Sequence, residues 1–293
     1  MIIKVAVFND LSGFGKCSLT AAIPVLSALG VSPHPVPTAV LTGQGGYPVF
    51  YCKDMTDMLG KYIKAWKAND AKFDAIYSGY LTGPRQIDYV LEFIKEFKKE
   101  NTFLLVDPVM GDNGRVYSIF SEELLDKMKL LVADADLITP NLTEACLLAG
   151  EQYEDVVSVK DSDKLIDKVI TIGDRIRSKS NVKQDVIITG VRTKEEDSMY
   201  IYNVGITNEG NFKIGSHMFN KSFSGTGDIF SSTMCGLKLN DVSTSESMNI
   251  ANDFLYHSIA DTMNDKVSGN DGIYFEKHLY KLIKERCDYE RNN

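Results

Sequence analysis

Residues 103–112 read Phe-Leu-Leu-Val-Asp-Pro-Val-Met-Gly-Asp, and this stretch decides the fold class. Its first four residues are apolar without in-and-out alternation, which is typical of a strand covered on both faces. The acidic residues Asp107 and Asp112 follow at once. In α/β sheets, ligands bind in the crevice beyond the carboxyl ends of the strands. We therefore predict a buried parallel strand that ends in ligand-facing carboxylates, with a plain Asp-Pro turn as the alternative.

Similar apolar runs recur along the chain and alternate with amphipathic stretches. The predicted strands are Ile3–Phe8, Ser32–Val40, Ala75–Ser78, Phe103–Val106, Leu137–Ile138 and Val186–Thr189. The apolar stripe of a helix occurs in Ile87–Lys99, Leu165–Ser178 and Glu246–Met263. Strand–helix alternation on this scale predicts an α/β fold, with a mostly parallel central sheet and helices on both faces.

Two regions depart from this pattern. Residues 41–55 are rich in Gly, Tyr and Thr, and we expect them to form a lid or an edge ribbon. Residues 198–219 are predicted to form a β-hairpin that turns at Asn208-Glu209-Gly210. No Pro- or Ser-rich linker divides the chain, so we predict a single domain over residues 1–293 that is frayed at Tyr289–Asn293.

The composition excludes several classes of partner. A formal net charge of -8 disfavours nucleic acid or an anionic membrane surface as the main partner. The chain contains no run of about 18 apolar residues, so we predict no transmembrane helix. The five cysteines are odd in number and form no CxxC pair, and the four histidines form no close cluster. We therefore expect a cytoplasmic protein without disulfides or a zinc site.

The segment Ser224–Phe230, Ser-Gly-Thr-Gly-Asp-Ile-Phe, precedes an apolar helical stretch. Its two glycines let the backbone turn tightly and aim successive N–H groups into one concavity, where the helix N-terminus adds positive potential. This predicts an anion hole at Gly225, Thr226 and Gly227, with Asp228 as the base for an attacking hydroxyl group. A glycine turn with an Asp helix cap is the alternative.

The segment Thr139–Glu144 also follows a predicted strand and opens a helix. Asn141 can donate to phosphate oxygens, and Glu144 can hold a hydrated Mg²⁺ ion. An Asn three residues before a Glu also resembles a capping box, so both interpretations stay open.

Near the N-terminus, Asp10 and Ser12 are predicted to reach a small substrate, with an exposed turn as the alternative. The same region is a near miss to a P-loop, because Asp10 replaces the first Gly and Cys17 replaces the Ser/Thr. We reject a P-loop for that reason. Tyr80 is a candidate for stacking on an aromatic ring and Gln44 for a hydrogen bond to it, although such residues are more often core and loop residues.

The order and spacing of four segments resemble the ribokinase-like superfamily, and within it the pyridoxal (vitamin B6) kinase family. These segments are Ser78–Leu81, Asp107–Asp112, Thr139–Glu144 and Gly225–Asp228. The resemblance extends from about Val5 to Met263. It implies a three-layer α/β/α fold with small β lid elements and a homodimer. It also implies transfer of phosphate from ATP with Mg²⁺ to the 5′-hydroxymethyl group of pyridoxal, pyridoxine or pyridoxamine, in pyridoxal 5′-phosphate salvage.

The resemblance also assigns roles to matched positions. It makes Asp228 the general base and the N–H groups of Gly225 to Asp228 the anion hole. The resemblance implies that Asp107 and Glu144 bind the metal. It implies that the residues facing the nucleotide are Asp107, Asp112, Thr139, Asn141, Glu144, Thr189 and Thr226. The residues that it turns toward the substrate are Asp10, Ser12, Gln44 and Tyr80. A monovalent cation such as K⁺ often assists in this family, but the sequence does not place it.

Departures from the family pattern keep other functions open. Many pyridoxal kinases carry Ser where this chain has Asp10, and Asp10 followed by Ser12-Gly13 looks more like a hydroxymethylpyrimidine kinase of thiamine biosynthesis. An acidic Asp10 suits a cationic or amino-bearing ring. A non-catalytic protein that binds B6 or ATP is disfavoured, since a pure binder needs no base. A sugar kinase and an NAD-dependent dehydrogenase fit less well, because their signatures are missing.

Overall fold

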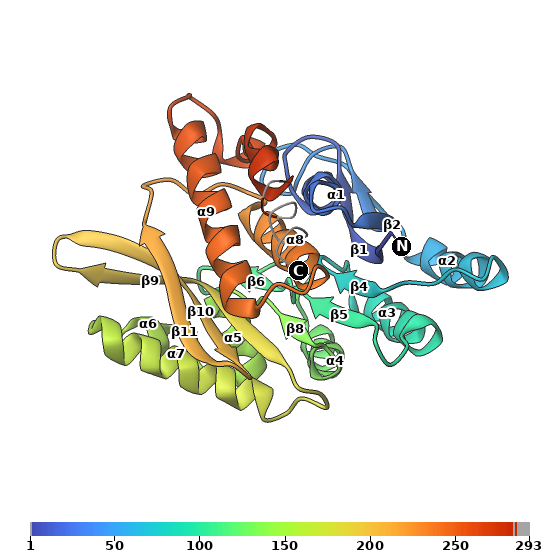
Figure 1. The fold of residues 1–293 in the computed structure, drawn as a ribbon, viewed down its shortest axis with the longest axis horizontal. Helices are drawn as coiled ribbons and strands as arrows, with labels where there is room; N and C mark the ends of the chain where they lie inside the picture. The colour runs from blue at the N-terminus through green and yellow to red at the C-terminus, as the bar shows by residue number, and fades with distance from the viewer. Residues whose placement is uncertain (1, 284, 286–293) are drawn as a thin grey trace. The chain divides into compact units, whose positions relative to one another are not determined.

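A computed structural model describes residues 2–283 and 285 of the chain. The chain divides into two compact units, Met1–Phe103 with Phe219–Asn293, and Leu104–Met218. Each unit combines strands with helices (Figure 1). The predicted α/β class with a mostly parallel sheet is confirmed, and the single domain over 1–293 stays a prediction.

The first unit is built on parallel strands. Its elements are β1 (Lys4–Ser12), α1 (Ser18–Ala28), β2 (Ser32–Leu41), β3 (Cys52–Asp54), α2 (Thr56–Ala68), β4 (Ala75–Ser78), α3 (Pro84–Phe97), α8 (Thr226–Lys238), α9 (Thr244–Met263), η1 (Gly269–Asp271) and η2 (Phe275–His278). The strand order is β4-β1-β2-β3, with β1 parallel to β2 and β4 and with β3 antiparallel to β2. Every residue from Val5 to Asp10 in β1 is buried, which requires protein on both faces of the strand.

Helix α8 is fixed by packing along its buried side. It contacts α1 and α9 (Figure 1), and the three helices share an apolar cluster that includes Val25, Leu29, Ile229 and Phe254. Burial of such side chains stabilises a structure by roughly 1.5–3 kcal/mol each. The first turn of α8 therefore has a firmly held starting position.

The second unit contains the other strands. Its elements are β5 (Phe103–Val106), β6 (Gly111–Asp112), β7 (Arg115–Val116), α4 (Glu122–Ala133), β8 (Leu137–Ile138), α5 (Leu142–Ala149), α6 (Tyr153–Val157), α7 (Ser162–Arg177), β9 (Asp185–Glu195), β10 (Ser198–Thr207) and β11 (Gly210–His217). The strand order is β11-β10-β9-β8-β5. Strand β8 is parallel to β5 and β9, whereas β10 is antiparallel to β9 and β11. Strands β6 and β7 form a separate pair.

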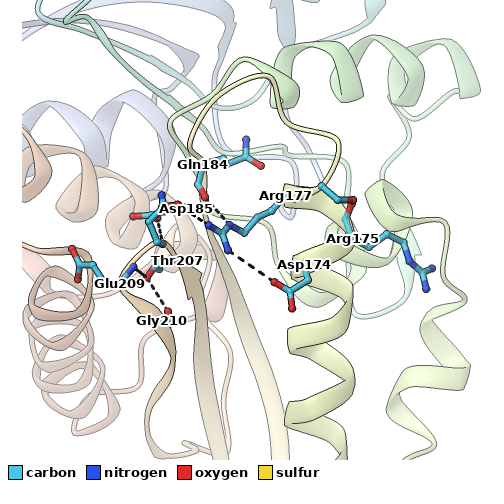
Figure 2. A network of polar contacts seen from close by, with 10 residues as sticks. Asp174, Arg175, Arg177, Gln184, Asp185, Thr207, Glu209 and Gly210 are labelled. Atoms are coloured by element: carbon cyan, nitrogen blue, oxygen red, sulfur yellow. Dashed lines mark hydrogen bonds and ion pairs between the residues drawn. The ribbon is translucent and has the colours of Figure 1, made fainter.

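The predicted hairpin is present, and its turn is tied to the end of α7 (Figure 2). The Arg177 guanidinium donates to the Gln184 carbonyl oxygen at 2.8 Å and to Asn208 Oδ1 at 2.9 Å. The backbone N–H of Asn208 donates to Asp185 Oδ1 at 3.2 Å. The Thr207 hydroxyl closes the turn by donating to the Gly210 carbonyl oxygen at 2.9 Å. These bonds pin the register of the antiparallel ribbon.

The predicted strands Ala75–Ser78, Phe103–Val106 and Leu137–Ile138 match the structure residue for residue. Strand β9 runs beyond the predicted Val186–Thr189 because its pairing with β10 continues to Glu195. In the predicted lid or ribbon region, β3 pairs with the edge of β2. The expected fraying at Tyr289–Asn293 lies outside the described residues.

The structure also bears on two expectations from composition, which concern transmembrane helices and disulfides. In residues 2–283 and 285, no helix has both the length and the apolar character needed to cross a membrane. The cysteines of the described segments, Cys17, Cys52, Cys146 and Cys235, are free thiols. Cys287 lies outside those segments.

Candidate active site

The first unit brings the end of β1 to the start of α8. Asn9 Nδ2 donates a hydrogen bond of 3.1 Å to Asp228 Oδ1, although the two residues are 219 positions apart in the chain. Asp228 is the third residue of α8, and Gly225 is the helix cap. The carboxylate predicted to be the base is therefore held by the strand predicted to reach the substrate.

The surroundings of Asp228 make its carboxylate more basic than usual. Burial, together with the nearby charge of Asp10, raises the pKa of Asp228 to about 6. Hydrogen bonds from the Ser18 backbone N–H and from Asn9 act in the opposite direction and favour the ionised form. A carboxylate with a pKa just below neutrality is ionised at pH 7 and accepts a proton readily.

The turn before α8 contains the N–H groups of the predicted anion hole. The first N–H groups of any α-helix have no intrahelical acceptor, and here they belong to the turn at Gly225 to Asp228. Gly225 has a φ of 83°, in the left-handed region that favours glycine. A Cβ atom on Gly227 would have no protein atom within 4 Å, so this part of the turn borders open space. The Thr226 hydroxyl donates locally, to the Phe223 carbonyl oxygen at 3.2 Å.

Asp10 lies in a buried cluster of hydroxyl groups. Ser12 Oγ donates to Asp10 Oδ2 at 2.8 Å, and Ser18 Oγ donates to Asp10 Oδ1. Burial raises the pKa of Asp10, whereas the two serine hydroxyls lower it. Asp10 is only 6% exposed and Ser12 only 1%, so the exposed-turn alternative for these two residues is wrong.

The two candidates for contact with the ring have different settings. The Tyr80 backbone N–H donates to Asn9 Oδ1 at 2.9 Å, and burial raises the pKa of its phenol to about 12, so the hydroxyl stays protonated at neutral pH. The Gln44 side chain makes one distant and one local hydrogen bond: Nε2 donates to the Asn270 carbonyl oxygen of η1 at 3.3 Å, and Oε1 accepts from the Gly46 N–H at 2.7 Å. Contact of either residue with a substrate stays a prediction.

In the second unit, Asn141 and Glu144 form the capping box of α5. Asn141 Oδ1 accepts from the N–H groups of Thr143 at 2.9 Å and Glu144 at 3.1 Å. Glu144 Oε2 accepts from the Asn141 N–H at 2.9 Å, and Oε1 accepts from the Met110 N–H at 3.0 Å. The Asn141 amide also donates to the Gly111 carbonyl oxygen at 2.7 Å. The capping-box interpretation of this pair is therefore confirmed, and its contact with a nucleotide or metal stays a prediction.

The same unit contains Asp107 and Glu144, the two carboxylates predicted to serve a hydrated Mg²⁺ ion. Burial, and then the negative charge of Asp107, raise the pKa of Glu144 well above its usual range. Mg²⁺ is often bound through one or two carboxylates, substrate phosphates and several waters. In the part of the chain that the structure describes, no group of three or more His, Cys, Asp or Glu side chains is arranged to hold a metal. Two carboxylates alone would leave most ligands of a Mg²⁺ ion to water and phosphate, and a magnesium site at Asp107 and Glu144 stays a prediction.

The remaining predicted nucleotide-facing residues belong to the second unit: Thr139 directly follows β8, Asp112 ends β6, and Thr189 lies inside β9 and not at its predicted end. The Thr139 N–H donates to the Val106 carbonyl oxygen at 3.2 Å, and the Thr189 N–H donates to the Pro140 carbonyl oxygen at 2.9 Å. Asp112 is exposed in β6, where its carboxylate accepts from the side chain and backbone of the following residue, Asn113.

Sequence reasoning missed Asn9 and Ser18. The Ser18 hydroxyl donates to Asp10, and its N–H donates to Asp228, so one residue bridges the two carboxylates of the first unit. Ser18 has a φ of 50°, which is uncommon for a residue with a side chain. The position of Asn9 directly before Asp10, at the end of a buried strand, was the one available signal.

Comparisons with known proteins agree on a kinase family. A family model described as phosphomethylpyrimidine kinase matches residues 15–271. The pyridoxal kinase of Dictyostelium discoideum is 28% identical over 284 residues, which cover 92% of this chain and 89% of that protein. A Bacteroides thetaiotaomicron protein assigned as a phosphomethylpyrimidine kinase was crystallised with pyridoxal. It is 36% identical to this chain, the match covers 96% of each of the two chains, and the TM-score is 0.87.

The fold also matches a more distant structure. Pyridoxal kinase from Lactobacillus plantarum has a TM-score of 0.86 at 24% identity, with 97% of this chain and 98% of that chain covered. This likeness concerns the fold.

Proposed function

The chain belongs to the phosphomethylpyrimidine kinase family, and from that premise we propose that it phosphorylates the 5′-hydroxymethyl group of a B6 vitamer with ATP. The resemblance to ribokinase-like B6 kinases is confirmed by the family match and by the relatives. The finer assignment of substrate and residues rests on the arguments that follow.

The observation that carries the proposal is the setting of Asp228. Its carboxylate lies in the first turn of α8, beside N–H groups without intrahelical acceptors, and its pKa is about 6. In the proposed step, the substrate hydroxyl attacks the γ-phosphorus of ATP while its proton passes to Asp228. A new O–P bond forms, the bond between the γ-phosphorus and the β,γ-bridging oxygen breaks, and ADP leaves.

The turn at Gly225, Thr226 and Gly227 is proposed to stabilise the charge on the transferring phosphoryl group. Backbone N–H groups fixed before the reaction need no reorganisation as that charge develops. Mg²⁺ held through waters at Asp107 and Glu144 would neutralise phosphate charge when bound. Asn141, Thr139 and Thr189 are proposed to bind the nucleotide.

Two relatives favour a B6 vitamer as the substrate. The Dictyostelium discoideum relative is a pyridoxal kinase, and the Bacteroides thetaiotaomicron relative was crystallised with pyridoxal. Tyr80, adjoining the Asn9–Asp228 pair through its backbone, is proposed to stack on the pyridine ring. Homodimer formation, a cytoplasmic location and assistance by K⁺ stay predictions.

The second candidate function is phosphorylation of a hydroxymethylpyrimidine. Asp10 is the observation that favours it, because a buried carboxylate near Asp228 suits an amino-bearing ring. Both candidates use the same base and the same phosphoryl donor. They differ in the ring that the first unit accepts.

The decisive experiment measures phosphoryl transfer from Mg-ATP to pyridoxal, pyridoxine, pyridoxamine and hydroxymethylpyrimidine. Values of kcat/KM are compared, and the phosphorylated products are identified by mass. We expect the highest kcat/KM with a B6 vitamer. Preference for the pyrimidine would replace the first candidate by the second. ATP-dependent phosphorylation of none of the four would overturn both.

A further inference from the structure

We propose that Asn9 is a positioning residue, which with one side chain holds both the carboxylate of Asp228 and the backbone of Tyr80. The inference deepens the proposed function and rests on it, since Asp228 is the proposed base and Tyr80 the proposed contact of the ring. It assigns to the last part of β1 the task of aligning the base with the substrate.

Both polar atoms of the Asn9 side chain form hydrogen bonds to residues of the proposed site. Nδ2 donates to Asp228 Oδ1 at 3.1 Å, and Oδ1 accepts from the N–H groups of Asp10 at 3.1 Å and Tyr80 at 2.9 Å. Reversing the amide would face its NH₂ group to two N–H donors, so these three partners fix its orientation. The side chain links residues from β1, from the segment that follows β4 and from α8.

Burial and close packing restrict Asn9 to this position. The residue is 0% exposed, so any lost hydrogen bond leaves a polar group without water. A Cβ atom on Gly79 would lie 2.5 Å from Asn9 Nδ2. The glycine before Tyr80 therefore makes room for the amide, and the Gly79 N–H donates to the Phe8 carbonyl oxygen at 2.8 Å. The ends of β1 and β4 therefore pack closely on either side of the Asn9 side chain.

An amide is the side chain that this task requires. Its donor end favours the ionised, proton-accepting form of Asp228, and its acceptor end satisfies two buried N–H groups. Aspartate has the same shape and keeps the acceptor, but it loses the donor and brings a negative charge. The titratable groups that interact with Asp228 are Asp10 from β1 and Cys17 from the start of α1. An added carboxylate would join this cluster.

The test compares Asn9→Asp and Asn9→Ser with the unchanged enzyme, using kcat and KM for pyridoxal from pH 5 to pH 9. We expect Asn9→Asp to move the acid limb of the kcat profile upward by about one pH unit or more, as a like charge raises the pKa of the base. A shift of one unit from a pKa of about 6 lowers the ionised fraction, and with it kcat, about twofold at pH 7 and close to tenfold at about pH 5. Asn9→Ser, which cannot reach all three partners, should lower kcat without adding charge, with little change in the KM for ATP.

Gln86→Glu is the matched control. Gln86 is another buried amide of the first unit: Nε2 donates to the Thr38 carbonyl oxygen at 2.8 Å, and Oε1 accepts from the Thr82 N–H at 2.9 Å. This exchange also replaces a buried amide with a carboxylate. It should lower thermal stability and leave the acid limb where it is.

A second measurement separates this inference from the proposed function. Carbon-13 NMR titrates the Asp228 carboxyl group, whose signal is identified by its loss in Asp228→Asn. If the unchanged protein phosphorylates no vitamer, the proposed function fails, whereas a raised pKa of Asp228 in Asn9→Asp still supports the hold of Asn9 on that carboxylate. An unchanged pKa in Asn9→Asp, or an unaltered kcat profile in an active enzyme, would overturn the inference.

Discussion

The backbone of Gly225 lies against the carbonyl oxygen of Lys16, so closely that a Cβ atom on Gly225 would be 1.9 Å from that oxygen. No side chain can occupy this position without moving one of the two segments. Lys16 is held in turn, since its Nζ forms an ion pair of 2.8 Å with Glu276 and lies 4.9 Å from the centre of the Tyr274 ring. The loop at Lys16 therefore packs against the backbone of the proposed anion hole, although we assign it no contact with phosphate.

Replacing Gly225 by Ala should destabilise the protein strongly. A left-handed backbone costs a residue with a Cβ atom roughly 1–2 kcal/mol, and the contact with Lys16 adds to that cost. We expect the free energy of unfolding, measured in urea, to fall by more than about 2 kcal/mol.

Gly227→Ala is the matched control for stability. Its Cβ would meet no protein atom within 4 Å, and alanine favours a helix by about 0.5–1 kcal/mol over glycine. An equal loss of stability in both variants would contradict the account of the Gly225–Lys16 contact.

Asp228→Asn should separate activity from stability. Loss of the base should lower kcat by about 10²–10⁴ or more with a smaller effect on ATP affinity, because the proton is accepted in the transition state. Removal of a buried carboxylate with a pKa of about 6 should stabilise the fold by up to about 3 kcal/mol at pH 7. Steady-state kinetics and thermal unfolding check the two parts. Near-normal turnover would refute the role of base.

The activity should fall in acid as Asp228 is protonated. Its pKa is about 6 in the folded protein, so kcat is expected to be flat above that pH and to drop about tenfold per pH unit well below it. The folded pKa is raised, so this group favours the folded state most in acid. That contribution is lost as pH rises from the ordinary carboxyl range through about 6. The stability gain of Asp228→Asn should therefore shrink as pH falls from about 6 and be nearly gone below about 4.

Asp10→Ser tests which ring the first unit prefers. A buried carboxylate attracts an amino-bearing substrate, so the substitution should raise the KM for pyridoxamine more than the KM for pyridoxal. Steady-state kinetics with both vitamers provide the comparison. Equal effects on the two would end the hypothesis that Asp10 selects the amine.

Asn141→Ala tests the capping role in the second unit. The variant removes the acceptor for the N–H groups of Thr143 and Glu144 and the donor to Gly111. We expect a loss of about 1–2 kcal/mol in the free energy of unfolding. Ser121→Ala, which removes the single capping bond to the Leu124 N–H, is the milder control. A loss of ATP affinity in Asn141→Ala with unchanged stability would favour direct contact with phosphate over the cap.

Much of the fold was readable because the signals are local. Buried parallel strands show as uninterrupted apolar runs, so the run Phe103–Val106 marked β5 without knowledge of its neighbours. The hairpin at Asn208 was predicted from residues adjacent in sequence. The end of β9 was missed because antiparallel pairing with β10, rather than the residues of β9, extends that strand to Glu195.

The sequence by itself determined the core of the buried parallel strands, the turn at Gly225–Asp228 and the acidic residues after β5, since each depends on neighbours in the chain. Only the tertiary structure decided that Asn9 holds Asp228, that Ser18 bridges two carboxylates and that Lys16 abuts Gly225. The physical reason is distance along the chain. Asn9 and Asp228 are 219 residues apart, and no local propensity records a contact that exists only once β1 and α8 are packed in one core.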